Sequence, residues 1–495
     1  MKTSVLDRLP LDKVARFLWG AALFCLPVTS FRYYPLLGEG TFVRPLALYP
    51  IALLLLLSLI QFLRGKVSIP RAGVLVPLTA FVLFTLTASS FGAWLDPLPM
   101  RGQEYFGRVI RAWATVAIGL SFFISALWMN RSEEDVRFSV RWILAGFVMD
   151  VLWSGVQMAA LYTPLLEKET VTHWQLIFSM RELTIANRVS GMAYEPAWLA
   201  GQIATVYLPW IFAALLTRVR VTRFRWFEIA LLGCAGLLLL VSLSRGGLLT
   251  TGVALVLTFL LTGRAELRTA WNWFVSGFKI RNGALLRSGI IVVFIGVLAG
   301  AVFFLSRNDY VAGLFNSDAE NLQEFIVDNY AGARGAYTAG ALGAYKERPL
   351  FGVGLGASGF YMYENMPDWA MTFLPEISRQ LAPNSHLYPN PKNMYVRLLA
   401  ETGLIGFVLF MIYLFSILGD ILRTLQSGTI FSRYLGIAGL FSWIAILIYN
   451  GTQDSFATPN IWINFGILAG ISAVAMKNEN FTSTPLPDGE PAEIS

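Results

Sequence analysis

The polar segment from residue 384 to residue 397 carries the side chains best suited to chemistry, and it runs directly into the apolar segment 398–422. His386 lies in it, and because the ordinary pKa of a histidine is about 6.5, this side chain suits a general base at neutral pH. Lys392 could take that role only where its surroundings favoured the neutral amine, and it could instead hold a phosphate oxygen with a fixed positive charge. Asn393 and Tyr395 follow and are expected to support the site. The junction predicts chemistry at a membrane surface.

Glu195 is a second candidate catalytic residue. Pro196 follows it and suits the first turn of a helix, so the carboxylate is expected near a helix N-terminus, held by the helix dipole and by a nearby arginine. A catalytic role and a capping or ion-paired role both remain open. Asp454 and Asp150 rank lower, because the first is expected to be solvated in a loop and the second to pair inside the membrane.

Three arginines in separate segments could bind an anionic substrate together. They are Arg188, Arg245 and Arg334. Guanidinium groups bind phosphate oxygens in a two-pronged manner, so several of them at one place suit a diphosphate. The alternative for Arg245, in the tight turn 242–247, is a structural role in which its side chain reaches water or an ion-pair partner.

The elements that must position these side chains are membrane-spanning helices. The chain is 56% hydrophobic and 14% charged, whereas about 25% of the residues of a soluble domain are charged. About twelve apolar segments have the length that crosses a bilayer. They are continuously apolar, which predicts an all-α, polytopic helical bundle and not a barrel. They centre near Ala22, Leu54, Phe84, Ile118, Val151, Val206, Leu237, Leu255, Phe294, Phe410, Ala445 and Gly466.

The distribution of Lys and Arg predicts the orientation. More than half of the 38 basic residues fall in short connections on the same side as the N-terminus, so both termini are expected in the cytoplasm and the candidate residues outside. The net charge of +7 is then explained by inner loops that face anionic lipids. Nucleic-acid binding is disfavoured, because the sequence has no soluble basic domain to carry it.

The chain divides into four predicted parts. Residues 1–306 hold nine transmembrane helices, 307–392 form a large outer loop, 393–477 hold three more helices, and 478–495 are an acidic, disordered cytoplasmic tail. Within the outer loop, 319–330 and 335–347 have helical composition, which predicts a helical cap. The glycines of 352–356 predict tight turns, since no alternation of strands and helices surrounds them. Residues with the spacing of metal ligands are absent, so metal-independent chemistry without a cofactor is expected.

Four segments resemble motifs of the superfamily of O-antigen ligases, Wzy-type polysaccharide polymerases and bacterial O-oligosaccharyltransferases. They are 188–191 with 195–196, 244–247, Arg334 with 348–354, and 393–395 with 399–406, of which the last is the most specific. The resemblance implies a membrane glycosyltransferase at the outer face of the bacterial inner membrane. It also implies a glycan donor on undecaprenyl diphosphate whose diphosphate the three arginines hold, a glycan acceptor, and a flippase and a chain-length regulator as pathway partners.

One departure from the family pattern bears on the function. Many ligases of the family have a histidine directly before the asparagine that is Asn393 here, and this chain has Lys392 there. A base, where one is needed, would then be His386 or Glu195. The departure favours a polymerase of repeat units over an O-antigen ligase or an O-oligosaccharyltransferase. A transporter or lipid flippase is the alternative of another class, disfavoured because the polar candidates lie at helix ends and not at the bilayer midplane.

Overall fold

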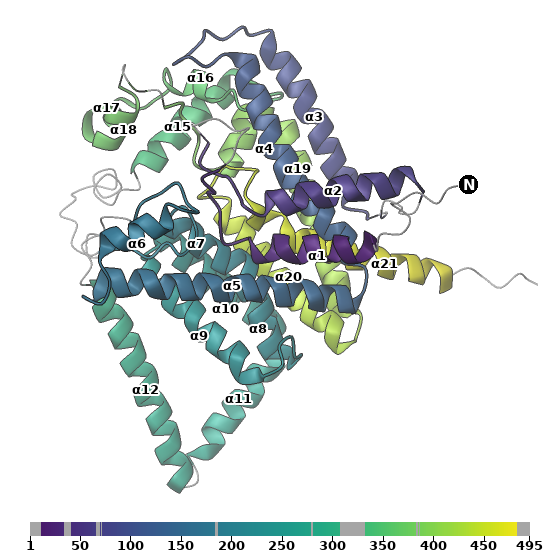
Figure 1. Cartoon of the computed structure of the whole chain (residues 1–495), viewed down its shortest axis with the longest axis vertical. Helices are drawn as coiled ribbons and strands as arrows, with labels where there is room; N and C mark the ends of the chain where they lie inside the picture. Colours follow the sequence, from purple (N-terminus) through teal and green to yellow (C-terminus); the bar gives the residue numbers. More distant parts are fainter. Residues whose placement is uncertain are drawn as a thin grey trace, which may run out of the picture.

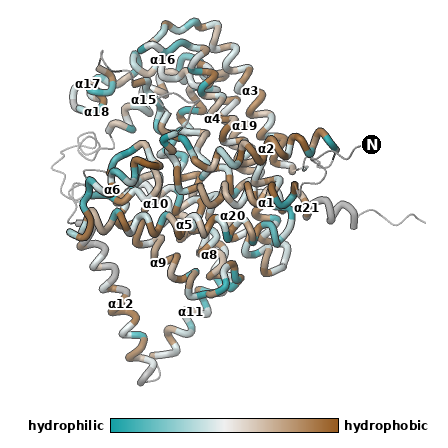
Figure 2. Tube along the Cα trace, in the orientation of Figure 1, coloured by the Kyte–Doolittle hydropathy of each residue, from teal (hydrophilic) through white to brown (hydrophobic). Residues whose placement is uncertain are grey.

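The structure is a computed structural model, shown in Figure 1, and it describes residues 11–33, 41–65, 70, 72–183, 187–278, 281–306, 332–382, 385 and 387–482. Every regular element in these ranges is a helix, as the continuously apolar segments predict. Figure 2 shows hydrophobic residues along the lengths of the long helices and hydrophilic residues in connections such as the one around α6. The chain is a multi-pass membrane protein of the helical-bundle class.

All twelve predicted segments lie in helices. Eight of the described helices are long and apolar enough to cross a membrane: α3 (Leu75–Ala93), α4 (Tyr105–Met129), α5 (Glu133–Tyr162), the continuous unit α7–α8 (Pro196–Thr217), α9 (Arg225–Ser242), α10 (Arg245–Thr262), α19 (Met394–Gln426) and α20 (Ile430–Tyr449). The other four predicted segments lie in α1 (Leu11–Phe24), α2 (Leu48–Leu63), α12 (Arg281–Ser306) and α21 (Ile463–Thr482). Helix α6 (Lys168–Gln175) is short, and α11 (Arg264–Gly277) joins α10 to α12.

Close helix packing forms the core of the bundle. Gly119 of α4 faces Trp462, and a Cβ there would lie 2.3 Å from the indole nitrogen. Gly466 of α21 touches the backbone of Phe123, with a Cβ position 2.6 Å from its carbonyl oxygen. Small residues let transmembrane helices approach in this way. The α7–α8 unit is interrupted by a π-helical turn, Ile203–Tyr207, where Tyr207 stacks on Phe147 of α5.

Helix α19 is broken at Gly403, which has φ +64° and ψ −169°. The segment 349–354 supplies the hydrogen bonds that the helix loses: Leu404 N donates to Pro349 O (2.8 Å) and Val353 N donates to Ala400 O (2.9 Å). Irregular backbone survives at membrane depth only when protein groups satisfy it. The two motif segments 348–354 and 399–406 are therefore partners of each other, with a structural role.

We expect Gly403→Ala to destabilise the protein by about 3 kcal/mol from backbone strain alone, because this φ/ψ region is almost restricted to glycine. A Cβ would also lie 2.3 Å from the backbone carbonyl of Leu350. Gly419→Ala is the matched control in the same helix, where no atom lies within 4 Å of the added carbon. It should be neutral or stabilising, since alanine favours a helix interior. Thermal unfolding in detergent measures both, and equal stability of the two variants would contradict this account.

The described part of the long segment before α19, called here the cap, is helical, as predicted for 335–347. It contains α15 (Gly332–Glu347), α16 (Gly359–Met362), α17 (Asp368–Phe373) and α18 (Pro375–Gln380), and α15 packs against α19 (Figure 1). The glycines at 352, 354 and 356 have φ of +71°, +101° and +80°, which confirms the predicted tight turns. The predicted helical stretch 319–330 lies outside the described residues.

Candidate functional site

The turn between α9 and α10 presents Arg245 at the start of a helix. Leu243 takes a left-handed conformation (φ +49°), and Ser244 Oγ accepts a hydrogen bond from Gly247 N (3.2 Å), which caps α10. Arg245 follows directly and is half-buried. Gly247 packs on Ala200 of α7, where a Cβ would lie 2.3 Å from the alanine methyl carbon. Arg245 therefore lies beside the helix that Glu195 precedes.

Arg188 reaches the same turn from the other side. Its Nε donates to the carbonyl of Ser242 (2.9 Å), and Val189 N donates to Val241 O (3.2 Å). The backbone before α7 thus runs along the end of α9. The structure brings Arg188 and Arg245 to one turn, as the sequence predicted.

Arg334, in the first turn of α15, joins this region through the loop after α20. Its Nη1 donates to the carbonyl of Thr452 (2.8 Å). The Thr452 methyl group lies 3.7 Å from the Cβ position of Gly246 in α10. The three arginines therefore surround the neighbouring ends of α10 and α20, an arrangement called here the arginine rim.

Glu195 faces the same region as one half of an ion pair. Its Oε2 lies 3.2 Å from Arg181 Nη1, and both side chains are about one-third exposed (32% and 34%). The carboxylate makes no side-chain hydrogen bond that caps α7, and it is ion-paired with Arg181. The side chain of Tyr449 lies in the neighbourhood of both Glu195 and Arg334.

Tyr449 lies in this region, and the sequence reasoning did not single it out. It ends α20, and its ring packs on Gly201 of α7, with a Cβ position there 2.3 Å from a ring carbon. A tyrosine at the end of an apolar segment resembles an ordinary interfacial anchor. The only sequence signal was its position next to the polar run 450–455.

Lys392 lies close to α15 and to the same loop after α20 that Arg334 contacts. It is exposed and has φ +58°, its amide donates to Asp454 Oδ2 (3.0 Å), and its ammonium lies 5.9 Å from the ring centroid of Tyr337. Asp454 was expected to be merely solvated and instead holds the backbone before α19. His386 lies outside the described residues.

Asn393 and Tyr395 have structural partners. Asn393 Oδ1 accepts from Tyr395 N (2.9 Å) and Val396 N (3.2 Å), so it caps α19. The Tyr395 hydroxyl donates to Leu447 O (2.6 Å) and ties α19 to α20. Asp150, expected to pair inside the bundle, accepts from Met192 N (2.7 Å).

A buried ion pair lies behind Lys392 and Asn393. Arg397 Nε is 2.9 Å from Glu401 Oε2, and the glutamate side chain is 3% exposed. Ser358 Oγ donates to Glu401 Oε1 (2.9 Å), and Arg397 also donates to the carbonyl of Asp454. This network joins α19, the cap and the loop after α20, so it holds these three elements in place relative to one another.

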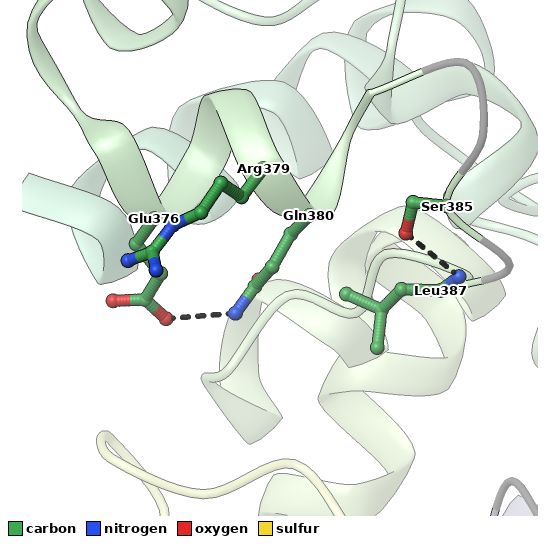
Figure 3. A pocket seen from close by; sticks show the side chains of 5 residues that line it. All are labelled: Glu376, Arg379, Gln380, Ser385 and Leu387. Atoms are coloured by element: carbon green, nitrogen blue, oxygen red, sulfur yellow. Dashed lines mark hydrogen bonds between the residues drawn. The ribbon is translucent and has the colours of Figure 1, made fainter.

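An open cavity of about 390 Å³ lies between α18 and the segment before α19, and none of its lining residues belongs to the arginine rim. Figure 3 shows the lining: Glu376, Arg379, Gln380, Ser385 and Leu387. Its shape is set by Arg101, whose guanidinium donates to five backbone carbonyls, those of Gln380, Leu381, Ala382, Ser385 and Leu387. Arg101 thus acts as a structural clamp for this part of the cap.

No cluster of three or more His, Cys, Asp or Glu side chains placed to hold a metal ion occurs within the described ranges. The expectation of metal-independent chemistry rests on sequence and stays a prediction.

Comparison with known proteins supports the resemblance. Residues 229–411 match the family model described as O-antigen ligase. Over this segment the chain is similar to the O-antigen ligase family, in agreement with the motifs seen in its sequence. The matched region begins in α9 and ends in α19, so it contains Arg245, Arg334, Lys392 and Asn393, whereas Arg188 and Glu195 precede it. No curated protein matches the chain. Members of this superfamily are membrane glycosyltransferases or ligases, and the arginine rim lies partly within the family's own segment.

Proposed function

We propose that this O-antigen ligase-family enzyme polymerises oligosaccharide repeat units carried on undecaprenyl diphosphate, at the outer face of the bacterial inner membrane. The observation that carries the proposal is the arginine rim. Arg188, Arg245 and Arg334 come from three distant segments and meet at neighbouring helix ends. A diphosphate at the head of a lipid is an anion that such a rim suits, because guanidinium groups bind its oxygens in pairs.

In the proposed reaction, a hydroxyl oxygen of the acceptor sugar attacks the anomeric carbon of the donor. The new glycosidic bond forms as the bond from that carbon to the diphosphate oxygen breaks, which inverts the anomeric configuration. Undecaprenyl diphosphate leaves with the bonding electron pair. The arginine rim stabilises the negative charge that grows on the diphosphate, and a site that holds both lipid-linked substrates supplies further acceleration.

The proton of the acceptor hydroxyl needs a destination. Glu195 precedes the helix that packs on the start of α10, and its ion pair with Arg181 orients its carboxylate. His386 remains the second candidate base from the sequence. Lys392, exposed beside α15, fits the role of an additional positive charge for a phosphate oxygen.

Reconstitution tests the proposed function directly. The purified protein is incubated in liposomes with a short repeat unit on undecaprenyl diphosphate, without nucleotide sugar, and the products are separated on a gel. A ladder of longer lipid-linked glycans is expected. Transfer that occurs only when lipid A core or a protein is added would instead identify a ligase or an oligosaccharyltransferase. No covalent product with any acceptor would overturn the enzymatic proposal in favour of transport.

We expect the transfer rate to be unchanged by removal of divalent cations. The rim supplies positive charge from arginines, which stay protonated at all working pH values, so charge neutralisation does not require an added ion. The measurement is the ladder assay with excess EDTA, compared with the same assay in magnesium. Activity that disappears with the chelator and returns with magnesium would contradict this prediction.

A further inference from the structure

Two glutamines buried behind the site, Gln157 of α5 and Gln175 of α6, form a connected pair called here the amide pair. They are 0% and 1% exposed. Gln157 Nε2 donates to Gln175 Oε1 (2.6 Å), and Gln175 Nε2 donates to the carbonyl of Arg181 (2.9 Å). The pair thus connects the transmembrane helix α5 to the residue whose guanidinium binds Glu195.

Gln157 also holds the backbone that leads from Arg188 to Glu195. Its Oε1 accepts from both Ser190 N (3.1 Å) and Gly191 N (2.8 Å), while its Nε2 donates to Gly191 O (2.9 Å). Together with the bond to Gln175, these contacts use both donors and both acceptor positions of the amide. A buried amide with every position satisfied, three of them by residues 190–191, specifies one conformation of this backbone.

Asp150 completes the same attachment two turns earlier on α5. Its Oδ1 accepts from Met192 N (2.7 Å), and residues seven positions apart share a helix face. Gly191 has φ +59°, and a Cβ there would lie 2.3 Å from Asp150 Oδ1. Three consecutive residues, 190–192, are therefore fixed against α5 by buried polar side chains.

We propose that Gln157 and Gln175 are positioning residues that set the places of Arg181, Glu195 and Arg188, so that the ion pair and the rim are formed before substrate binds. Gln175 acts on Arg181 by donating to the backbone carbonyl of Arg181, and Gln157 acts on the segment between Arg188 and Glu195. Neither glutamine touches the substrate. The catalytic part of this inference rests on the proposed function, but the geometric part is testable without any reaction.

The geometric test is a cross-linking rate. Arg181→Cys and Glu195→Cys are introduced together in a chain whose Cys25 and Cys234 are replaced by alanine, and a short bifunctional thiol reagent joins them. Adding Gln157→Leu or Gln175→Met is expected to slow the cross-link several-fold, because one or both segments lose their attachment. If Gln157→Leu does not fold, Gln175→Met still decides. It leaves the bonds of Gln157 to residues 190–191 in place and removes only the donor to the Arg181 carbonyl and one acceptor of the Gln157 amide.

Asn130→Leu is the matched control. Asn130 is a fully buried amide that binds Ala126 O (2.7 Å) and Ser139 Oγ (2.6 Å) at the opposite end of α5. The substitution removes a buried amide network of a similar kind, about 40 Å along the helix from Gln157 at 1.5 Å per residue. It should leave the cross-linking rate unchanged. Equal rates in the amide-pair variants and in this control would overturn the proposal.

The catalytic test is a double-mutant cycle on glycan transfer. Gln175→Met is expected to lower turnover about tenfold in the intact enzyme and to have little further effect in an Arg181→Ala background, because it acts through that residue. The Asn130→Leu effect should be the same in both backgrounds. If the losses of turnover from Gln175→Met and Arg181→Ala are additive, Gln175 does not act through Arg181. An enzyme that transfers no glycan at all refutes the proposed function and leaves the cross-linking result to decide the positioning role.

Discussion

Replacement of Arg188, Arg245 or Arg334 with alanine is expected to slow glycan transfer by roughly 10²–10³-fold for each residue, the usual loss when one preorganised donor to a developing anion is removed. The three guanidinium groups are held by different elements: the backbone before α7, the start of α10 and the start of α15. Each should act mainly on turnover, because the charge on the diphosphate is greatest as the glycosidic bond breaks. Initial rates of ladder formation with saturating donor measure this.

Arg379→Ala is the control for a general loss of outer positive charge. Arg379 is an exposed arginine on α18 whose Nε binds Pro375 O in its own helix (3.1 Å). Its loss should change the rate by less than about twofold, since an exposed charge that contacts only its own helix contributes little. Product inhibition gives a second readout: free undecaprenyl diphosphate should inhibit the rim variants less than it inhibits the wild type or the control. Wild-type rates from all three rim variants would refute the diphosphate assignment.

Lysine replacements separate charge from geometry at the rim. Arg245→Lys keeps the charge at the start of α10 but loses the planar fork that pairs with two phosphate oxygens. It should therefore recover only part of the rate that Arg245→Ala loses. Full recovery by lysine would indicate a site that needs positive charge near the lipid head group without a defined diphosphate geometry.

The sequence predicted the helices because membrane crossing is a local property. A continuous apolar segment of the required length must be helical in a bilayer whatever its neighbours are. The break in α19 was not predicted, because it depends on a partner segment about fifty positions earlier that supplies hydrogen bonds to Leu404 and accepts them at Ala400. Gly403 alone, in a favourable helical sequence, gives no sign of such a distant partner.

The candidate site could be proposed from the sequence for a related reason. Arginines beside apolar segments are costly and therefore conspicuous, so Arg188 and Arg245 were singled out by their position, and Arg334 by its place in the long segment before α19. Asn393 was also conspicuous, but its Oδ1 is used to cap α19. Tyr449, Gln157 and Gln175 were missed, since a tyrosine or a glutamine at such a position has no local signature. Their roles arise from contacts between segments that the sequence does not place together.

Loss of the buried carboxylate of Glu401 is expected to destabilise the fold by about 3–5 kcal/mol, because it leaves the guanidinium of Arg397 buried without its partner. Both side chains are largely inaccessible (3% and 11% exposed), and their nitrogen and oxygen are 2.9 Å apart. Glu401→Leu should lower the melting temperature of the purified protein markedly and reduce the amount recovered from membranes. The ion pair joins α19 to the cap and to the loop after α20, so the arginine rim would lose its support as well.

Two further variants separate the ion pair from the rest of the network. Ser358→Ala removes one hydrogen bond to Glu401 Oε1 and should cost only about 1 kcal/mol. Arg397→Met combined with Glu401→Leu removes both charges and should recover a substantial part of the stability that Glu401→Leu loses, because an apolar pair carries no desolvation cost. Recovery will be incomplete, since Arg397 also donates to the carbonyl of Asp454 and stacks on Phe456. A Glu401→Leu protein as stable as the wild type would contradict a buried ion pair. A double variant less stable than Glu401→Leu would show that the contacts of Arg397 with the loop contribute more to stability than the ion pair does.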